Sequence, residues 1–261
     1  MIRGNPVKQR LADGDTVFGT MMFEFLGPGL PQIAVNAGAD FLFYDMEHSG
    51  FSMEQIKQQC ALARGLDLTP MVRPAGKDYQ FAARLLDIGA MGLMFQMVES
   101  AEEARRLVAH TRYPPHGVRG ALFGGPHDDY LSEDIAAAVA EANERTLITV
   151  LIETERGLAN VDEILAVDGI DAAQMGHLDL SISMGIPGDV GHPRMQAAID
   201  TIAETAARHG KAAGMLVGDP DQGASFLDRG FRMISYSLDI ALFQNALKGG
   251  IDALQQHLRR D

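Results

Sequence analysis

Glu153 and Asp179 are two carboxylates that follow neighbouring predicted strands. Glu153 comes directly after the apolar run 147–152, and Asp179 comes shortly after the run 171–175. Apolar residues at helical spacing over 157–165 predict a helix between the two runs. A strand–helix–strand unit holds its strands parallel, about 4.8 Å apart where they are neighbours, so both carboxylates emerge at the same end. Two carboxylates this close repel unless a proton or a cation lies between them, and a hard divalent ion is the natural occupant.

Structural roles stay open for both carboxylates. Asp179 can cap the short helical stretch that follows it, and Glu153 can pair with Arg156. Glu155 is a competing metal ligand, but alternation of side chains along a strand directs it away from Glu153.

Gly176, His177 and Leu178 join the second strand to Asp179. Their backbone amides can cradle a substrate carboxylate as an anion nest. His177 can ligate a metal, form a wall of the site, or make a hydrogen bond within the loop. We therefore expect these three residues to bind substrate.

His48 follows Asp45 by three positions, at the end of another apolar run. Asp45 could hold the imidazole of His48 and fix which ring nitrogen accepts a proton, which makes His48 a candidate general acid or base. The alternative for His48 is a helix cap or a hydrogen bond to the backbone. Asp45 needs a partner because its strand is otherwise apolar, and His48, Arg73 or a structural hydrogen bond would each serve.

Arg73 ends a third apolar run and precedes a proline. In a catalytic role it would donate paired hydrogen bonds to a substrate carboxylate or to a developing oxyanion. In a structural role it would pair with Asp87 or Glu47.

Strands and helices alternate from end to end, which predicts a single-domain (β/α)8 TIM barrel with its chemistry at the carboxyl ends of the strands. The rival, a doubly wound open sheet, usually has a glycine fingerprint after its first strand, and 27–29 is not one. The glycine- and proline-rich segment 111–129 is long enough to suggest a functional loop. The predicted strands are 16–22, 41–46, 69–73, 92–98, 147–152, 171–175, 211–217 and 232–238, with helices between them that include 133–143 and a last one over 240–258.

Composition narrows the classes of partner. A net charge of -13 argues against nucleic acid or an anionic membrane. No apolar run approaches 18 residues, and the N-terminus lacks the apolar region of a signal peptide. The pattern around the single cysteine, Cys60, indicates a small buried hydrophobe and fits a reducing cytoplasm.

The site residues belong to motifs that occur in order along nearly the whole chain, and together these resemble the HpcH/HpaI aldolase family of metal-dependent class II 2-keto-acid aldolases. The motifs are Asp45-Met46-Glu47-His48, Val72-Arg73-Pro74, Leu86-Asp87-Ile88-Gly89-Ala90, Thr111-Arg112-Tyr113-Pro114-Pro115-His116-Gly117, Ile152-Glu153-Thr154 and Gly176-His177-Leu178-Asp179-Leu180-Ser181.

The resemblance implies a (β/α)8 barrel that cleaves or forms 4-hydroxy-2-keto acids from a 2-keto acid and an aldehyde, through an enolate on a divalent ion such as Mg²⁺, Mn²⁺ or Co²⁺. It implies that Glu153 and Asp179 bind the metal and that Arg73 contacts the keto oxygen. It also implies that His48, paired with Asp45, relays the proton of the C4 hydroxyl. A homo-oligomer is implied as well, typically a hexamer in which the last helix packs on a neighbouring subunit.

Two positions depart from the family pattern. The family commonly reads Gly-Pro-Ala-Asp where this chain has Gly176-His177-Leu178-Asp179, and many members have a glutamine where this chain has Leu151. Both lie beside the substrate, so hydroxypyruvate joins pyruvate as a candidate donor, with His177 near its extra hydroxyl. The alternatives are a lyase of the citrate-lyase-β or malyl-CoA type and a catalytically silent barrel that binds keto acids.

Overall fold

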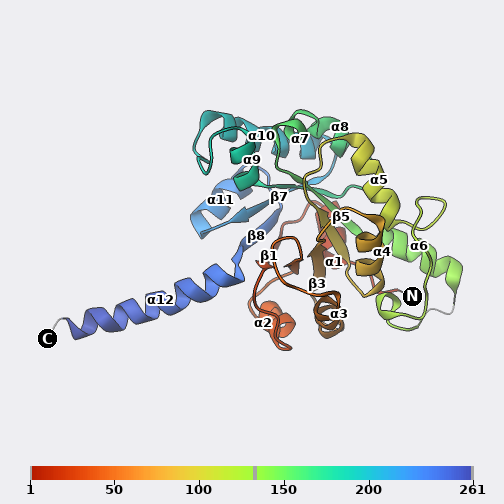
Figure 1. Cartoon of the computed structure of the whole chain (residues 1–261), viewed down its shortest axis with the longest axis horizontal. Helices are drawn as coiled ribbons and strands as arrows, with labels where there is room; N and C mark the ends of the chain where they lie inside the picture. The colour runs from red at the N-terminus through yellow and green to blue at the C-terminus, as the bar shows by residue number, and fades with distance from the viewer. Residues whose placement is uncertain (1, 132–133, 260–261) are drawn as a thin grey trace.

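The computed structural model describes residues 2–131 and 134–259, in which eight parallel strands close into a barrel (Figure 1). Each strand pairs with the next in the chain, and β8 pairs with β1. The prediction of a barrel is therefore confirmed, and the open sheet is excluded. The strands are β1 Val17–Met22, β2 Phe41–Asp45, β3 Thr69–Arg73, β4 Gly92–Phe95, β5 Leu147–Ile152, β6 Ala172–Met175, β7 Ala212–Val217 and β8 Met233–Leu238.

Helices pack around the barrel between successive strands (Figure 1). The helix predicted over 133–143 forms as α6, and Glu133 itself lies outside the described residues. Within the described ranges, no helix is both long and apolar enough to cross a membrane. The helices are α1 Pro6–Ala12, α2 Leu30–Asn36, α3 Met53–Leu62, α4 Tyr79–Asp87, α5 Ala101–Thr111, the 3-10 turn η1 Pro126–Asp128, α6 Ile135–Arg145, α7 Glu155–Ala159, α8 Val161–Leu165, α9 His177–Ser183, α10 Pro193–Arg208, α11 Pro220–Asp228 and α12 Asp239–Leu258.

The hydrophobic core has two layers. One layer fills the space between the outer face of the strands and the surrounding helices. The other lies inside the barrel, where residues two apart along each strand point to the same side. The interior layer includes Phe41, Phe43, Met71, Met94 and Met233, together with Val7 and Leu11 of α1. Because α1 shares the interior layer, it closes the end of the barrel where the strands begin, and the other end is left for the site.

The helix predicted over 157–165 is in fact two short helices, α7 and α8, that meet at Asn160. The side-chain Nδ2 of Asn160 donates a hydrogen bond to the carbonyl oxygen of Glu99 at 2.7 Å. The junction between the two helices is thereby tied to the segment between β4 and α5.

The long segment 111–129 has no regular structure apart from η1, and it packs against the rest of the domain. Tyr113 is buried, and Arg119 pairs with Asp87 at 2.7 Å. The segment leads from α5 to α6, which returns the chain to the end of the barrel where strands begin. None of its residues lines the cavity at the opposite end, and a functional role for the segment stays a prediction.

Helix α12 extends away from the barrel instead of packing along it (Figure 1). It is anchored at its first residue, where the carboxylate of Asp239 accepts hydrogen bonds from the backbone N–H groups of Phe23, Glu24 and Phe25 at 2.8–3.0 Å. Asp239 is also the one residue of α12 that is buried among the described residues. The helix therefore leaves most of its surface without an intramolecular partner.

Candidate active site

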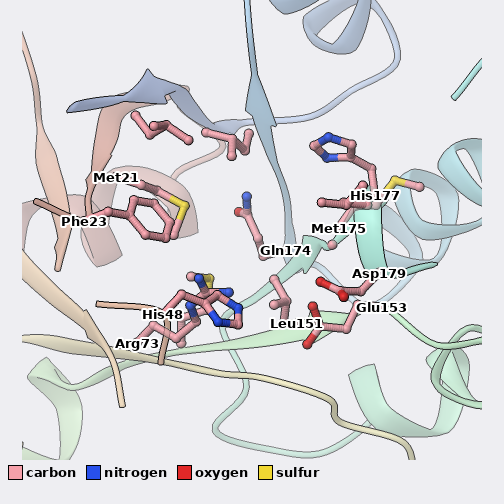
Figure 2. A pocket seen from close by; sticks show the side chains of 15 residues that line it. Met21, Phe23, His48, Arg73, Leu151, Glu153, Gln174, Met175, His177 and Asp179 are labelled. Atoms are coloured by element: carbon pink, nitrogen blue, oxygen red, sulfur yellow. The ribbon is translucent and has the colours of Figure 1, made fainter. Parts of the chain in front are cut away.

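A cavity of about 360 Å³ opens at the carboxyl ends of the strands (Figure 2). Its floor is formed by buried side chains, among them Met94, Leu151 and Gln174. The structure brings seven of the eight predicted site residues to this cavity, and the eighth, Asp45, lies buried just behind it. The seven that line the cavity are His48, Arg73, Glu153, Gly176, His177, Leu178 and Asp179.

Glu153 follows β5 and is only 3% exposed. Its Oε1 accepts a hydrogen bond from the backbone N–H of Met97 at 2.6 Å. A Cβ at Gly176 would lie 2.5 Å from the Cβ of Glu153, so only glycine fits beside this carboxylate. Burial raises the pKa of Glu153 to about 7, and the nearby carboxylates of Asp179 and Glu47 act in the same direction. A cation beside Glu153 would offset both the cost of burying its charged carboxylate and the repulsion from Asp179 and Glu47.

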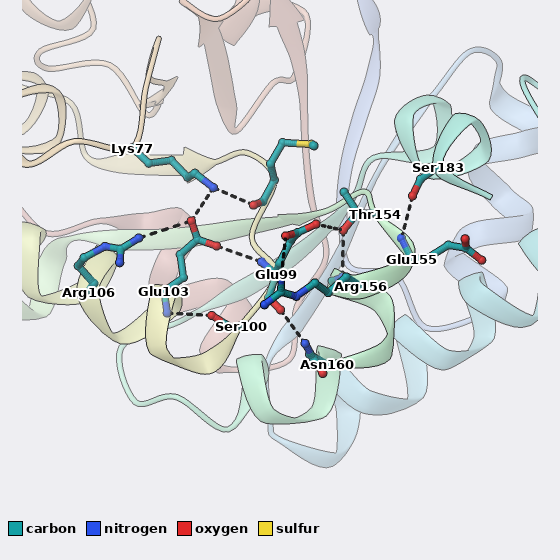
Figure 3. A network of polar contacts seen from close by, with 12 residues as sticks. Lys77, Glu99, Ser100, Glu103, Arg106, Thr154, Glu155, Arg156, Asn160 and Ser183 are labelled. Carbon is teal, nitrogen blue, oxygen red and sulfur yellow. Dashed lines mark hydrogen bonds and ion pairs between the residues drawn. The ribbon is translucent and has the colours of Figure 1, made fainter. Parts of the chain in front are cut away.

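Met97 is held in place by Lys77, which Figure 3 shows between Met97's strand-end loop and Glu103. It adopts a left-handed backbone conformation with φ of 50°, which few side chains take up without support. Lys77 provides that support, because its Nζ donates to the carbonyl oxygen of Met97 at 2.8 Å and also pairs with Glu103 at 2.5 Å. The Met97 N–H is thereby fixed on Glu153.

Asp179 lies in the first turn of α9, beside Glu153 on the same side of the cavity (Figure 2). The helix is capped at Gly176, so the alternative that Asp179 is the N-cap is wrong. The alternative pairing of Glu153 with Arg156 is also wrong, because Arg156 lies 3.8 Å from Glu99. Neither of these structural roles therefore takes either carboxylate away from the cavity.

Glu155, the competing ligand, pairs with Arg194 on the outer surface. Its backbone N–H donates to the hydroxyl of Ser183 at 3.0 Å (Figure 3). The prediction that it points away from Glu153 is confirmed.

The carboxylates of Glu153 and Asp179 suit a hard divalent cation, which prefers oxygen ligands. In the part of the chain that the structure describes, no group of three or more His, Cys, Asp or Glu side chains could hold a metal ion. The remaining ligands would have to be water or substrate oxygens, as is common for Mg²⁺. The residues present fit a cation that is shared between protein and substrate.

Asp45 does not orient the imidazole of His48, so that prediction is wrong. Its Oδ1 instead accepts a hydrogen bond from the backbone N–H of His48 at 2.6 Å, and its Oδ2 pairs with Nε of Arg73. The ring Nε2 of His48 lies 3.6 Å from Oε2 of Glu47, which is also 3.2 Å from Nη1 of Arg73. The short side chain of Asp45 begins the turn and so reaches a backbone N–H within it, as Asp side chains commonly do. The imidazole ring of His48 is not its partner.

The guanidinium of Arg73 is thus held on two sides, by Asp45 and Glu47. The predicted structural partner Glu47 is present, whereas Asp87 pairs with Arg119 instead. Arg73 also lines the cavity. It can therefore pair with Asp45 and Glu47 and still contact a substrate.

His177 opens α9 and lies across the cavity from His48 and Arg73 in Figure 2. Burial lowers the pKa of His177, although the carboxylate of Asp179 acts in the opposite direction. A neutral imidazole at this wall offers one donor and one acceptor nitrogen.

Gln174 also lines the cavity, and reasoning from the sequence missed it. It is 2% exposed, and it reaches into the cavity from β6 among apolar neighbours. The sequence could have pointed to it, because Gln174 is a single amide in an otherwise apolar strand. It precedes Gly176 by two residues, so the two lie on the same face of the strand.

A closed parallel barrel that gathers carboxylates, an arginine and a histidine at its strand ends is a (β/α)8-barrel enzyme. A family model described as HpcH/HpaI aldolase/citrate lyase matches residues 23–246. The chain belongs to the HpcH/HpaI aldolase/citrate lyase family, and it is a carbon–carbon lyase of the aldolase type.

Two curated relatives and one solved structure are similar over almost the full length. A hydroxypyruvate/pyruvate aldolase of Roseobacter denitrificans is 37% identical over 246 residues, which is 94% of each chain. A 2-keto-3-deoxy-L-rhamnonate aldolase of Escherichia coli is 34% identical over 93% of this chain and 90% of its own. The crystal structure of an HpcH/HpaI aldolase from Desulfitobacterium hafniense superposes with a TM-score of 0.92 at 32% identity, over 95% of this chain and 96% of that one.

Proposed function

We propose that this protein catalyses the reversible aldol cleavage and formation of 4-hydroxy-2-keto acids, from pyruvate or hydroxypyruvate and an aldehyde, with Mg²⁺ or Mn²⁺ at Glu153 and Asp179. The observation that carries the proposal is the pair of carboxylates facing one cavity opposite Arg73 (Figure 2). The name of the relative from Roseobacter denitrificans supports the choice of donors. A divalent cation at the carboxylate pair would supply Lewis acidity toward the keto oxygen.

The chain's own residues supply the rest of the chemistry. The first backbone N–H groups of α9 have no partner within the helix and are suited to bind the substrate carboxylate. Arg73, held by Asp45 and Glu47, donates toward the oxygen on C2 and stabilises negative charge there. His48 accepts the proton of the C4 hydroxyl as the C3–C4 bond breaks, which releases the aldehyde and leaves an enolate. A proton then adds to C3 to give the keto acid.

Release of pyruvate or hydroxypyruvate from 4-hydroxy-2-keto acids, measured with and without EDTA, tests the proposed function. We expect turnover with Mg²⁺ or Mn²⁺ and a loss of about 100-fold or more when EDTA removes the metal. Restoring activity by adding excess Mn²⁺ is the control for damage by the chelator. Turnover that EDTA does not affect would contradict the metal requirement, and inactivity with every aldehyde would favour the silent keto-acid-binding barrel.

We also propose that α12 packs on a second copy of this chain, within a homo-oligomer. An apolar stripe at helical spacing runs along its exposed surface, and a stripe of this kind on a projecting helix is typical of a contact between subunits. Phe243 in this stripe already touches Phe25 of its own barrel, with ring centroids 5.5 Å apart. The exposed apolar residues are Ile240, Leu242, Phe243, Leu247, Ile251, Leu254 and Leu258.

Replacing Leu247 and Leu254 together by aspartate is expected to reduce the oligomer, because two charges would have to be buried in an apolar contact. Light scattering coupled to size-exclusion chromatography measures the mass. Asn245→Asp, which adds charge to the same helix outside the stripe, is the matched control and should keep the mass of the parent chain. A monomeric parent chain, or an unchanged oligomer in the double variant, would contradict this role of α12.

A cytoplasmic location and small-molecule partners belong to the same proposal. The single thiol, Cys60, is buried and free, which a reducing compartment favours. The net charge of -13 disfavours contact with nucleic acid or an anionic membrane.

A further inference from the structure

Gln174 stands out in the floor of the cavity because it is polar where its neighbours are not. The buried floor residues around it are Met21, Met94 and Leu151, of which Leu151 is its direct partner in the β5–β6 register. An apolar side chain of similar size would fill the same space, so packing alone does not call for an amide here.

The amide of Gln174 is incompletely satisfied. Its Oε1 is buried and has no hydrogen-bond partner among the described residues. Thr149 and Ser235 also leave a hydroxyl unpartnered inside the barrel, but neither lines the cavity. A buried polar group without a partner destabilises the fold, so an unpartnered amide on a side chain that lines a cavity points to a ligand that completes it.

Space for this amide is made by Gly214 on β7, the register partner of Gln174. A Cβ at Gly214 would overlap the Gln174 amide, so any larger residue would force the side chain to move. The last side-chain bond of glutamine rotates over a broad range, so either end of the amide can be turned to the cavity. Gly214 on the neighbouring strand therefore leaves room for the amide of Gln174 to turn.

The chemistry of the amide selects the kind of group it would meet. A carboxylate or keto oxygen only accepts hydrogen bonds and would leave Oε1 unpaired, whereas a hydroxyl both donates and accepts. Gln174 precedes Gly176 by two residues, a separation of about 7 Å along the strand. A small keto acid bound beside Gly176 and Glu153 would thus extend toward this amide.

We propose that Gln174 is a specificity-determining residue that hydrogen-bonds a hydroxyl group of the substrate, with the C3 hydroxyl of hydroxypyruvate as its first candidate. The proposal rests on the function proposed above, and it names Gln174 rather than His177 as the residue that recognises the extra hydroxyl. The second candidate is the hydroxyl group of an aldehyde substrate that carries it next to the carbonyl carbon, because Gln174 could hydrogen-bond that hydroxyl in the same way.

The test measures kcat/KM for the aldol reaction with pyruvate or hydroxypyruvate, each combined with acetaldehyde or glycolaldehyde. Gln174→Met keeps the length of the side chain and removes the amide. We expect it to lower kcat/KM about tenfold or more with hydroxypyruvate, and to leave the pair of pyruvate and acetaldehyde within about twofold of the parent. If the loss follows glycolaldehyde instead, the hydroxyl that Gln174 binds belongs to the aldehyde, and the proposal stands in that form.

Matched variants separate recognition of a hydroxyl from a general effect on the barrel interior. Thr149→Val removes an unpartnered polar atom from the barrel interior outside the cavity, and it should change none of the four rates. An equal fall in all four rates for Gln174→Met, or no change in any, would overturn the assignment. A loss specific to hydroxyl-bearing substrates in His177→Asn but not in Gln174→Met would also overturn it. A parent chain inactive on all four pairs would instead refute the proposed function, and this inference with it.

Discussion

Replacing Glu153 by glutamine is expected to lower turnover by about 1,000-fold or more, because the cation would lose one of its two protein ligands. Glutamine keeps the size of the side chain and an oxygen that can still accept the Met97 N–H. The change therefore removes the charge without emptying a buried position. Turnover under saturating Mn²⁺ and the calorimetric affinity for Mn²⁺ measure the two consequences separately.

Glu155→Gln is the matched control for this variant. Glu155 is a carboxylate only two residues along the chain, but it pairs with Arg194 on the surface. Its replacement should leave both turnover and Mn²⁺ affinity unchanged. Retention of Mn²⁺ affinity and turnover by Glu153→Gln would show that the carboxylate pair is not the metal site.

The same variant has a distinct effect on stability in the absence of metal. The pKa of Glu153 is raised from 4.5 to about 7 in the folded chain, so between these values the folded state holds a proton that the unfolded state has lost. The free energy of unfolding must then fall as pH rises from about 4.5 to about 7, by about 3 kcal/mol in total. Denaturant unfolding at pH 5 and pH 7.5 should show a smaller fall in Glu153→Gln, and added Mn²⁺ should reduce the fall in the parent chain.

The barrel could be predicted from the sequence because parallel strands buried on both faces are short apolar runs, and these alternate with helical patterns along the whole chain. Glu153 and Asp179 could be predicted to meet for the same reason, since consecutive parallel strands end at the same rim. The break at Asn160 could not be predicted from the helical spacing of the apolar residues, because that spacing continues across it.

Side-chain pairing was harder to predict than position. Spacing alone suggested that Asp45 holds the ring of His48, whereas the carboxylate is taken up by Arg73 and by the backbone of His48. The pairing with Arg73 depends on the register of β2 against β3, which sets Asp45 directly beside Arg73. The register is set when the strands pair in the sheet, so it cannot be inferred from where each strand ends in the sequence.

Replacing Arg73 by alanine is expected to lower turnover by about 100- to 1,000-fold while the affinity for Mn²⁺ changes far less. Arg73 donates toward the substrate oxygen but is no metal ligand, so loss of the guanidinium should remove stabilisation of the developing charge alone. Stability should fall as well, by about 3–5 kcal/mol, because Asp45 is fully buried and would lose the partner of its charge. Steady-state kinetics, calorimetry with Mn²⁺ and denaturant unfolding give the three quantities.

Two further variants separate the catalytic part of this loss from the structural part. Arg119→Ala breaks another buried arginine pair, with Asp87 at 2.7 Å, outside the cavity, so it should cost stability without affecting turnover. Asp45→Asn combined with Arg73→Ala removes the orphaned charge, and it should recover stability while turnover stays low. If this double variant regained turnover, Arg73 would act only by neutralising Asp45, and if Mn²⁺ affinity fell in parallel with turnover, Arg73 would belong to the metal site. Neither result is expected, because Arg73 lines the cavity while two acids hold it on its other sides.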